Sequence, residues 1–139
     1  MATVSDIRFE KGDYLINGKP FLRHLSQHEG VTAQGFIPAF LGSGSLQHYT
    51  LMRKPDLIEG ATALYLCSHC GGYDGSPIGA KIEMNGDIVI WDKIGQYVDF
   101  EDDSCPPIPF KKVRKYVFEL SNYMSFIEAA KIHETPYYG

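Results

Sequence analysis

Long apolar runs and an excess of positive charge are both missing from this sequence. No stretch approaches the roughly 20 consecutive apolar residues of a membrane-spanning helix. The chain has 17 acidic residues against 13 lysines and arginines, and its formal net charge is −4. A nucleic-acid-binding surface needs clustered lysine and arginine, so we expect neither nucleic acid nor a membrane as a partner. The only basic cluster, Lys111 to Lys115, is interpreted as a solvated approach to a strand rather than as an anion site.

Cysteine is also scarce. The chain has three cysteines, and an odd number does not suit a disulfide framework. Residues 1–10 are polar and lack the apolar core of a signal peptide. We therefore expect a cytoplasmic protein whose thiols are reduced.

The length of 139 residues and the hydrophobic content of 44% suit one globular domain, so we expect a single α+β domain over residues 1–139. Apolar alternation and short apolar runs predict strands at about 6–10, 13–16, 61–67, 78–84, 87–94 and 115–118. Helical spacing predicts one helix between Pro20 and Gly30 and another over about 122–133, which Ser121 or Asn122 would cap. The predicted fold is an antiparallel β-sheet core with an N-terminal and a C-terminal helix packed on it.

The strands over 78–94 are predicted to form a hairpin at the centre of this sheet. Asn85-Gly86 between two apolar runs is a strong signal for a tight turn, because both residues tolerate positive φ. We expect Trp91 to be at least partly buried, on the same face as Val89. The opposite face is expected to carry the residues of the other parity, Ile82, Met84, Ile88 and Ile90.

Cys67 and Cys70 form a Cys-x-x-Cys motif at the end of a predicted strand. Zinc needs four ligands and no second pair is present. Cys105 and one of the five histidines, His24, His28, His48, His69 or His133, would have to complete the site. The alternative set that we name is Cys67, His69, Cys70 and Cys105. A redox-active dithiol needs a helix after the first thiol, and the glycine-rich segment 71–79 does not allow one. We interpret both thiols as structural and expect no cofactor, with a zinc-binding or dithiol redox module as the alternative.

His24 and His28 lie four residues apart on the first predicted helix and are close enough to share a metal ion. They lack the His-Glu-x-x-His order of a metalloprotease. We interpret them as a pair on the helix surface.

An acidic run follows the hairpin and offers the best candidate for a partner-binding site. Carboxylates flanked by aromatic side chains suit a surface that meets a basic protein. The candidate partner-binding residues are Tyr97, Asp99, Phe100, Glu101, Asp102 and Asp103. Residues 36–52, which are apolar and aromatic around a Gly-Ser-Gly-Ser centre, are a possible extension of this site.

Residues 61–130 resemble a family of small bacterial proteins. Its pattern is an apolar strand ending in a Cys/Gly turn, then a hairpin that reads Ile-Glu-x-x-Gly-Asp-x-Val-x-Trp, then a helix entry with Phe and Tyr. The matching residues are Cys67, Cys70, Gly71, Gly72, Ile82, Glu83, Gly86, Asp87, Val89, Trp91, Phe118 and Tyr123. Residues 14–20 also look like the first turn and helix of this family. Ser76-Pro77 departs from the pattern, where relatives have a further Cys or Gly, and this weakens a metal or redox role.

The function we expect is that of a small cytosolic binding protein. The chain is short and acidic and contains no complete catalytic motif. It is expected to be an immunity protein or inhibitor that neutralises a bacterial toxin by direct binding. Its expected partner is a basic toxin domain.

Overall fold

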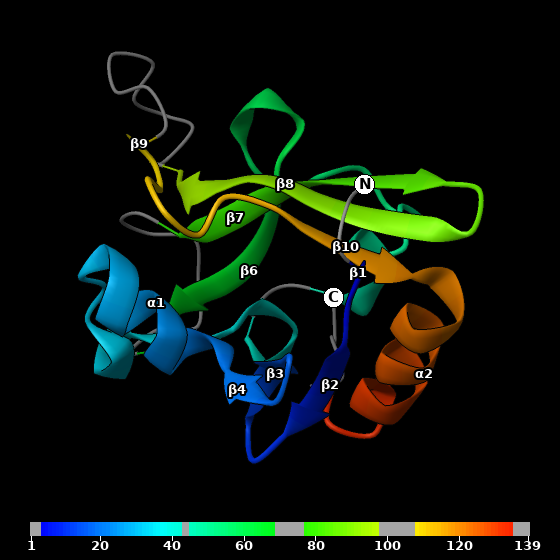
Figure 1. Ribbon diagram of the computed structural model, residues 1–139, viewed down its shortest axis with the longest axis horizontal. Coiled ribbons are helices and arrows are strands. Elements are labelled where there is room, and N and C mark those ends of the chain that lie inside the picture. The colour runs from blue at the N-terminus through cyan, green and yellow to red at the C-terminus, as the bar shows by residue number, and fades with distance from the viewer. Residues whose placement is uncertain (1–3, 43–44, 69–76, 98–107, 135–139) are drawn as a thin grey trace.

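The structure is a computed structural model, and it describes residues 4–42, 45–68, 77–97 and 108–134. Within these residues, seven strands form a main sheet (Figure 1). Its order is β1 (Val4–Ser5), β10 (Tyr116–Glu119), β8 (Ile88–Gln96), β7 (Ile78–Asn85), β6 (Thr62–Cys67) and β5 (Phe36–Pro38), with β9 (Ile108–Pro109) paired to the end of β8. All neighbours are antiparallel except β1 and β10, which run parallel.

A second, smaller sheet and both helices lie on one side of the main sheet (Figure 1). The small sheet consists of β2 (Ile7–Glu10), β3 (Asp13–Ile16) and β4 (Lys19–Pro20). The helices are α1 (Phe21–Glu29) and α2 (Leu120–Lys131). Short 3-10 turns occupy much of the stretch between α1 and β6, at Ala33–Gly35, Ala39–Leu41, Leu46–His48 and Ile58–Gly60. The expected α+β class, with an antiparallel-rich sheet and two helices, is confirmed; the first helix begins only at Phe21, after the small sheet.

The hairpin of β7 and β8 corrects one sequence expectation. Its two turn residues are Gly86 and Asp87, because Asn85 pairs with Ile88. Because the turn has two residues, even-numbered residues of β7 lie opposite odd-numbered residues of β8. Ile82 therefore lies opposite Trp91, and Met84 lies opposite Val89. The expected face of Ile82, Met84, Ile88 and Ile90 is therefore wrong: the first two share a face with Trp91, and the last two lie on the other face. Burial of Trp91 is confirmed, since its side chain is 0% exposed.

The start of α2 corrects a second expectation. The helix begins at Leu120, and neither Ser121 nor Asn122 caps it. The backbone N–H of Leu120 donates instead to the carbonyl of Asp87 in the hairpin turn, at 2.7 Å. The side chain of Asn122 pairs with the backbone of Ile7, accepting at 2.9 Å and donating at 3.2 Å, and so joins α2 to β2.

Aromatic side chains fill the space between the two sheets, and hydrogen bonds satisfy their polar atoms. Trp91 Nε1 donates to the hydroxyl of Tyr123 at 3.2 Å, and that hydroxyl donates to the carbonyl of Tyr49 at 2.8 Å. The hydroxyl of Tyr14 contacts that of Tyr49 and donates to the carbonyl of Leu64 at 2.7 Å. Burial raises the pKa of both Tyr14 and Tyr49 well above the ordinary value, so these side chains stay neutral.

Asp13 links this aromatic core to the first helix. Its carboxylate accepts the hydroxyl proton of Tyr65 at 2.5 Å and the backbone N–H of Leu22 at 3.0 Å. Pro20, at the start of α1, offers no side-chain cap, and Asp13 takes that role from β3. Burial raises the pKa of Asp13, although the hydrogen bonds that it accepts from Tyr65, Leu22 and the backbone N–H of Tyr14 work in the other direction. Among the described residues, no helix has the length and apolar character needed to cross a membrane.

Candidate functional site

The sequence candidates fall partly outside the described residues. Of the predicted partner-binding set, Asp99, Phe100, Glu101, Asp102 and Asp103 lie outside, and so do His69, Cys70 and Cys105 of the zinc alternative. Cys67 ends β6 and is half-buried. Within the described part of the chain, no group of three or more His, Cys, Asp or Glu side chains is placed to hold a metal ion.

Tyr97 is a buried support and not the exposed aromatic anchor that we expected. Its side chain is 2% exposed. Its hydroxyl donates to the carbonyl of Lys93 at 2.7 Å, and its backbone N–H donates to the carbonyl of Pro77 at 2.8 Å. Burial raises its pKa to about 12, and the nearby carboxylates of Glu59 and Asp92 act in the same direction. Tyr97 therefore fixes the end of β8 rather than offering a surface contact.

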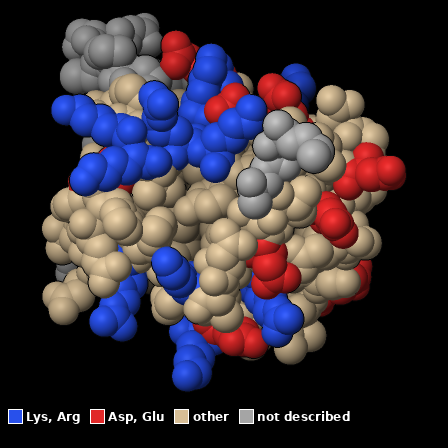
Figure 2. Space-filling model, viewed as in Figure 1, with Lys and Arg blue, Asp and Glu red and all other residues tan. Residues whose placement is uncertain are grey.

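A groove with a volume of about 630 Å³ runs beside this end of β8, and we call it the basic groove. Its apolar side chains are the buried Ile94 and Phe110 and, at the rim, Ile108, which is 55% exposed. Four cations and two carboxylates line it: Lys81, Lys93, Arg114, Lys115, Glu59 and Asp92. Figure 2 shows lysine and arginine side chains gathered over β9, the end of β8 and the segment that leads into β10.

A β-bulge shapes one wall of the groove. Lys93 and Ile94 on β8 oppose the single residue Ala80 on β7, where the register of the pairing shifts. Lys93 has φ of 51°, in the left-handed region. Its backbone N–H donates to the side-chain carboxylate of the neighbouring Asp92, at 2.8 Å. The bulge therefore places an exposed lysine side chain at the groove in a backbone conformation that glycine adopts at lower cost.

The segment 108–116 forms the other wall and is held at three points. β9 lies so close to Gly95 that a Cβ there would be 2.5 Å from the carbonyl oxygen of Ile108. Further along, the N–H of Phe110 donates to the carbonyl of Ile94 at 3.0 Å, and the N–H of Ile94 donates to the carbonyl of Arg114 at 3.1 Å. Between these contacts the segment arches away from β8, and α1 holds the arch.

Glu29, at the end of α1, holds this arch. Its carboxylate accepts three successive backbone N–H groups, from Lys111 at 3.1 Å and from Lys112 and Val113 at 2.7 Å each. Partial burial works to raise the pKa of Glu29, but the three donors and the charge of Lys112 outweigh it and lower the pKa. The basic cluster from Lys111 to Lys115 thus leads into strand β10, as expected. Its backbone N–H groups already bind one carboxylate of the same chain, that of Glu29.

The cations of the basic groove are not neutralised by the described part of the chain. Within residues 4–42, 45–68, 77–97 and 108–134, no carboxylate oxygen lies within 4 Å of the charged nitrogens of Lys81, Lys93, Arg114 or Lys115. Ion pairs in these ranges are found elsewhere, such as the pair of Lys131 with Glu128. Within the described residues, the groove therefore presents cations without an ion-pair partner, on a chain of net charge −4.

The expected histidine pair is present on α1. The rings of His24 and His28 are 4.4 Å apart. Burial, His28 and Lys19 lower the pKa of His24. The two rings are therefore neighbours on α1, as expected of a helix-surface pair.

Sequence reasoning did not find the basic groove. One local signal was present: Asp92-Lys93 interrupts the apolar alternation of the strand shortly before Gly95, which is typical of a bulge.

Comparisons of the chain with family models, with curated proteins and with solved structures found no match. The family resemblance of residues 61–130 therefore stays a prediction.

Proposed function

We propose that this chain is a small binding protein that neutralises a partner protein by direct contact, as immunity proteins and toxin inhibitors do. The basic groove supports a binding role, because its cations have no ion-pair partner among the described residues and lie beside apolar side chains, of which Ile108 is exposed. Protein interfaces typically combine an apolar centre with a polar rim. A groove of about 630 Å³ suits a segment of a partner that reaches out from its surface.

The single feature that supports this most strongly is Lys93. Strained backbone conformations persist where the surrounding structure enforces them, and they concentrate at binding and catalytic sites. Here the strained residue is charged, exposed and at the wall of the groove. A purely structural bulge would be served better by glycine.

The predicted acidic surface remains part of this proposal. Asp99 to Asp103 would meet a basic patch on the toxin, while the basic groove would meet an acidic part of the same partner. Charge complementarity of this kind accelerates association and selects partners. The two surfaces have opposite signs, so charge reversal at each of them separates their contributions.

The test starts from the partner. A tagged chain purified from its source organism should carry one protein in a stoichiometric complex, and added chain should abolish the toxic activity of that protein at an equimolar ratio. Lys115→Glu should weaken the complex, whereas Lys19→Glu, which makes the same charge change outside the groove, should not. A chain that forms no such complex, or that neutralises its partner only in large excess, would contradict the proposed function.

A further inference from the structure

The basic groove also indicates what kind of ligand it takes. We infer that it binds an extended acidic peptide segment of the partner, in which carboxylates alternate with apolar side chains. This inference rests on the proposed function, since the partner supplies the segment. It adds the chemistry of recognition: carboxylates bind the cations on the two walls, and an apolar side chain between them packs on the exposed Ile108 at the rim.

The backbone at Lys93 distinguishes it from the other residues with unusual conformations. Five non-glycine residues have positive φ among the described residues: Lys11, Asn17, Leu51, Glu59 and Lys93. The first four lie in turns or in a 3-10 turn, where such conformations are common. Lys93 alone among the five lies inside a strand. Lys93 also lines the groove, and an ammonium group is what a carboxylate needs for an ion pair.

The cations are arranged along two walls rather than at one point. Lys81 and Lys93 come from β7 and β8, and Arg114 and Lys115 come from the segment that arches over to β10. Charges spread in this way suit an extended ligand with several separate carboxylates. Arginine can bind a carboxylate through two parallel hydrogen bonds, which adds orientation to affinity.

The composition of the groove favours an acidic peptide over a nucleic acid. Glu59 and Asp92 line the groove beside the cations and would repel a continuous row of phosphates. The net charge of −4 would also slow the approach of a long polyanion. Peptide carboxylates can be spaced to avoid both acidic residues, and peptide side chains can use the exposed rim of Ile108.

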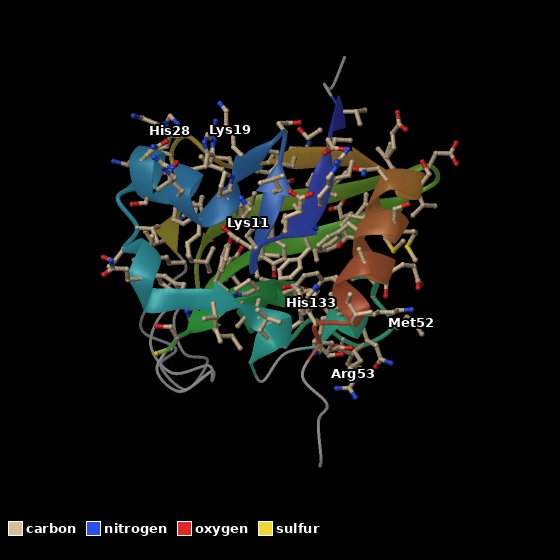
Figure 3. All side chains as sticks on the ribbon, turned by 90° about the horizontal axis from the view of Figure 1, so that it is seen from below. Lys11, Lys19, His28, Met52, Arg53 and His133 are labelled. Atoms are coloured by element: carbon tan, nitrogen blue, oxygen red, sulfur yellow. The ribbon has the colours of Figure 1, made fainter. Side chains whose placement is uncertain are left out.

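The experiment uses a fluorescein-labelled decapeptide in which glutamate alternates with leucine or serine, and it measures fluorescence anisotropy. Lys93→Gly should weaken binding about tenfold, which corresponds to about 1.4 kcal/mol. Lys11→Gly is the matched control: it makes the same change at another lysine of positive φ, in the turn between β2 and β3 (Figure 3). It should leave the affinity unchanged. Lys93→Arg should retain most of the affinity, because it keeps the charge.

Several further results decide whether the groove binds an acidic peptide. A peptide with glutamine in place of each glutamate should bind much more weakly, and added salt should weaken the acidic peptide. Equal binding by Lys93→Gly and wild type would overturn the inference, and so would tighter binding of a single-stranded RNA decanucleotide than of the peptide. If the natural partner binds Lys93→Gly with unchanged affinity, the groove inference fails while the binding function stands. If no protein partner forms a complex with the wild-type chain, the proposed function itself fails.

Discussion

Replacing Lys93 with glycine should raise the free energy of unfolding, although it removes a charged side chain from the groove. A left-handed conformation such as the φ of 51° at Lys93 costs a residue with a Cβ roughly 1–2 kcal/mol. Glycine offsets part of this gain, roughly 0.4–1 kcal/mol, because it has more conformational freedom to lose on folding. Both hydrogen bonds of residue 93 use only its backbone and survive the change. The expected net gain is about 0.8 kcal/mol, or a Tm about 3 °C higher.

Urea unfolding, followed by the fluorescence of the single tryptophan, measures this change directly. Trp91 is fully buried, so its emission should report loss of the core. Lys11→Gly should be stabilised to a similar extent, because Lys11 has φ of 54°. Lys81→Gly, in the interior of β7, should be destabilised instead. A lower stability for Lys93→Gly, together with a higher one for Lys11→Gly, would refute the view that Lys93 is strained for the sake of binding.

Four other predictions follow from the structure and the sequence. Trp91→Ala should lower the free energy of unfolding by about 3–5 kcal/mol in urea titrations, because a fully buried indole leaves a cavity. Wild type should lose stability relative to Asp13→Asn as pH rises from the ordinary pKa of an aspartate to the raised pKa of Asp13 in the folded protein. Melting curves of both proteins across pH 3–7 measure this difference. Changing Cys67 and Cys70 to Ser should lower the Tm modestly and leave partner binding intact; lost binding in a folded variant would instead favour the zinc or redox alternative. Reversing residues 101–103 to Lys should slow association with a basic partner at low salt more than at high salt, as stopped-flow mixing would show.

The upward shift of the Asp13 pKa decides how the stability of the folded protein changes with pH. Its folded-state pKa is raised, so the folded protein holds this proton to a higher pH than the unfolded chain does. The bound proton therefore contributes to the free energy of unfolding. This contribution is fully present below the pKa of Asp13 in the unfolded chain and is lost as pH rises through its pKa in the folded protein. A difference between wild type and Asp13→Asn that does not change with pH would show that burial does not perturb this carboxyl.

Local sequence patterns were sufficient for most strands and for the buried hairpin. Strands predicted at 61–67 and 87–94 are observed as Thr62–Cys67 and Ile88–Gln96, since short apolar runs and turn residues mark such elements directly. The face assignment failed because it gave one face to residues of the same parity on both strands. A two-residue turn instead pairs even-numbered with odd-numbered residues, whether the turn is Gly86-Asp87 or Asn85-Gly86. Asn122 fits a helix cap by sequence pattern, and the sequence does not show that β2 lies beside it and pairs with its side chain.

The candidate site was less predictable because its parts meet only through tertiary structure. The arch that forms one wall depends on Glu29, whose partner Lys111 is 82 residues away in the sequence. Lys81 and Lys93 lie on adjacent strands and join Arg114 only because the segment 108–116 folds back along β8. Charges that look dispersed along the chain are therefore gathered on one face.

Backbone NMR of the isotope-labelled chain, titrated with the acidic peptide, tests most directly whether the basic groove is the binding surface. We predict saturable shifts of the amide signals of Lys81, Lys93, Ile94, Ile108 and Arg114, with no change at Lys11 or Lys19. Shifts confined to the face of the small sheet and α1, or no shifts at all while the natural partner still binds, would contradict it.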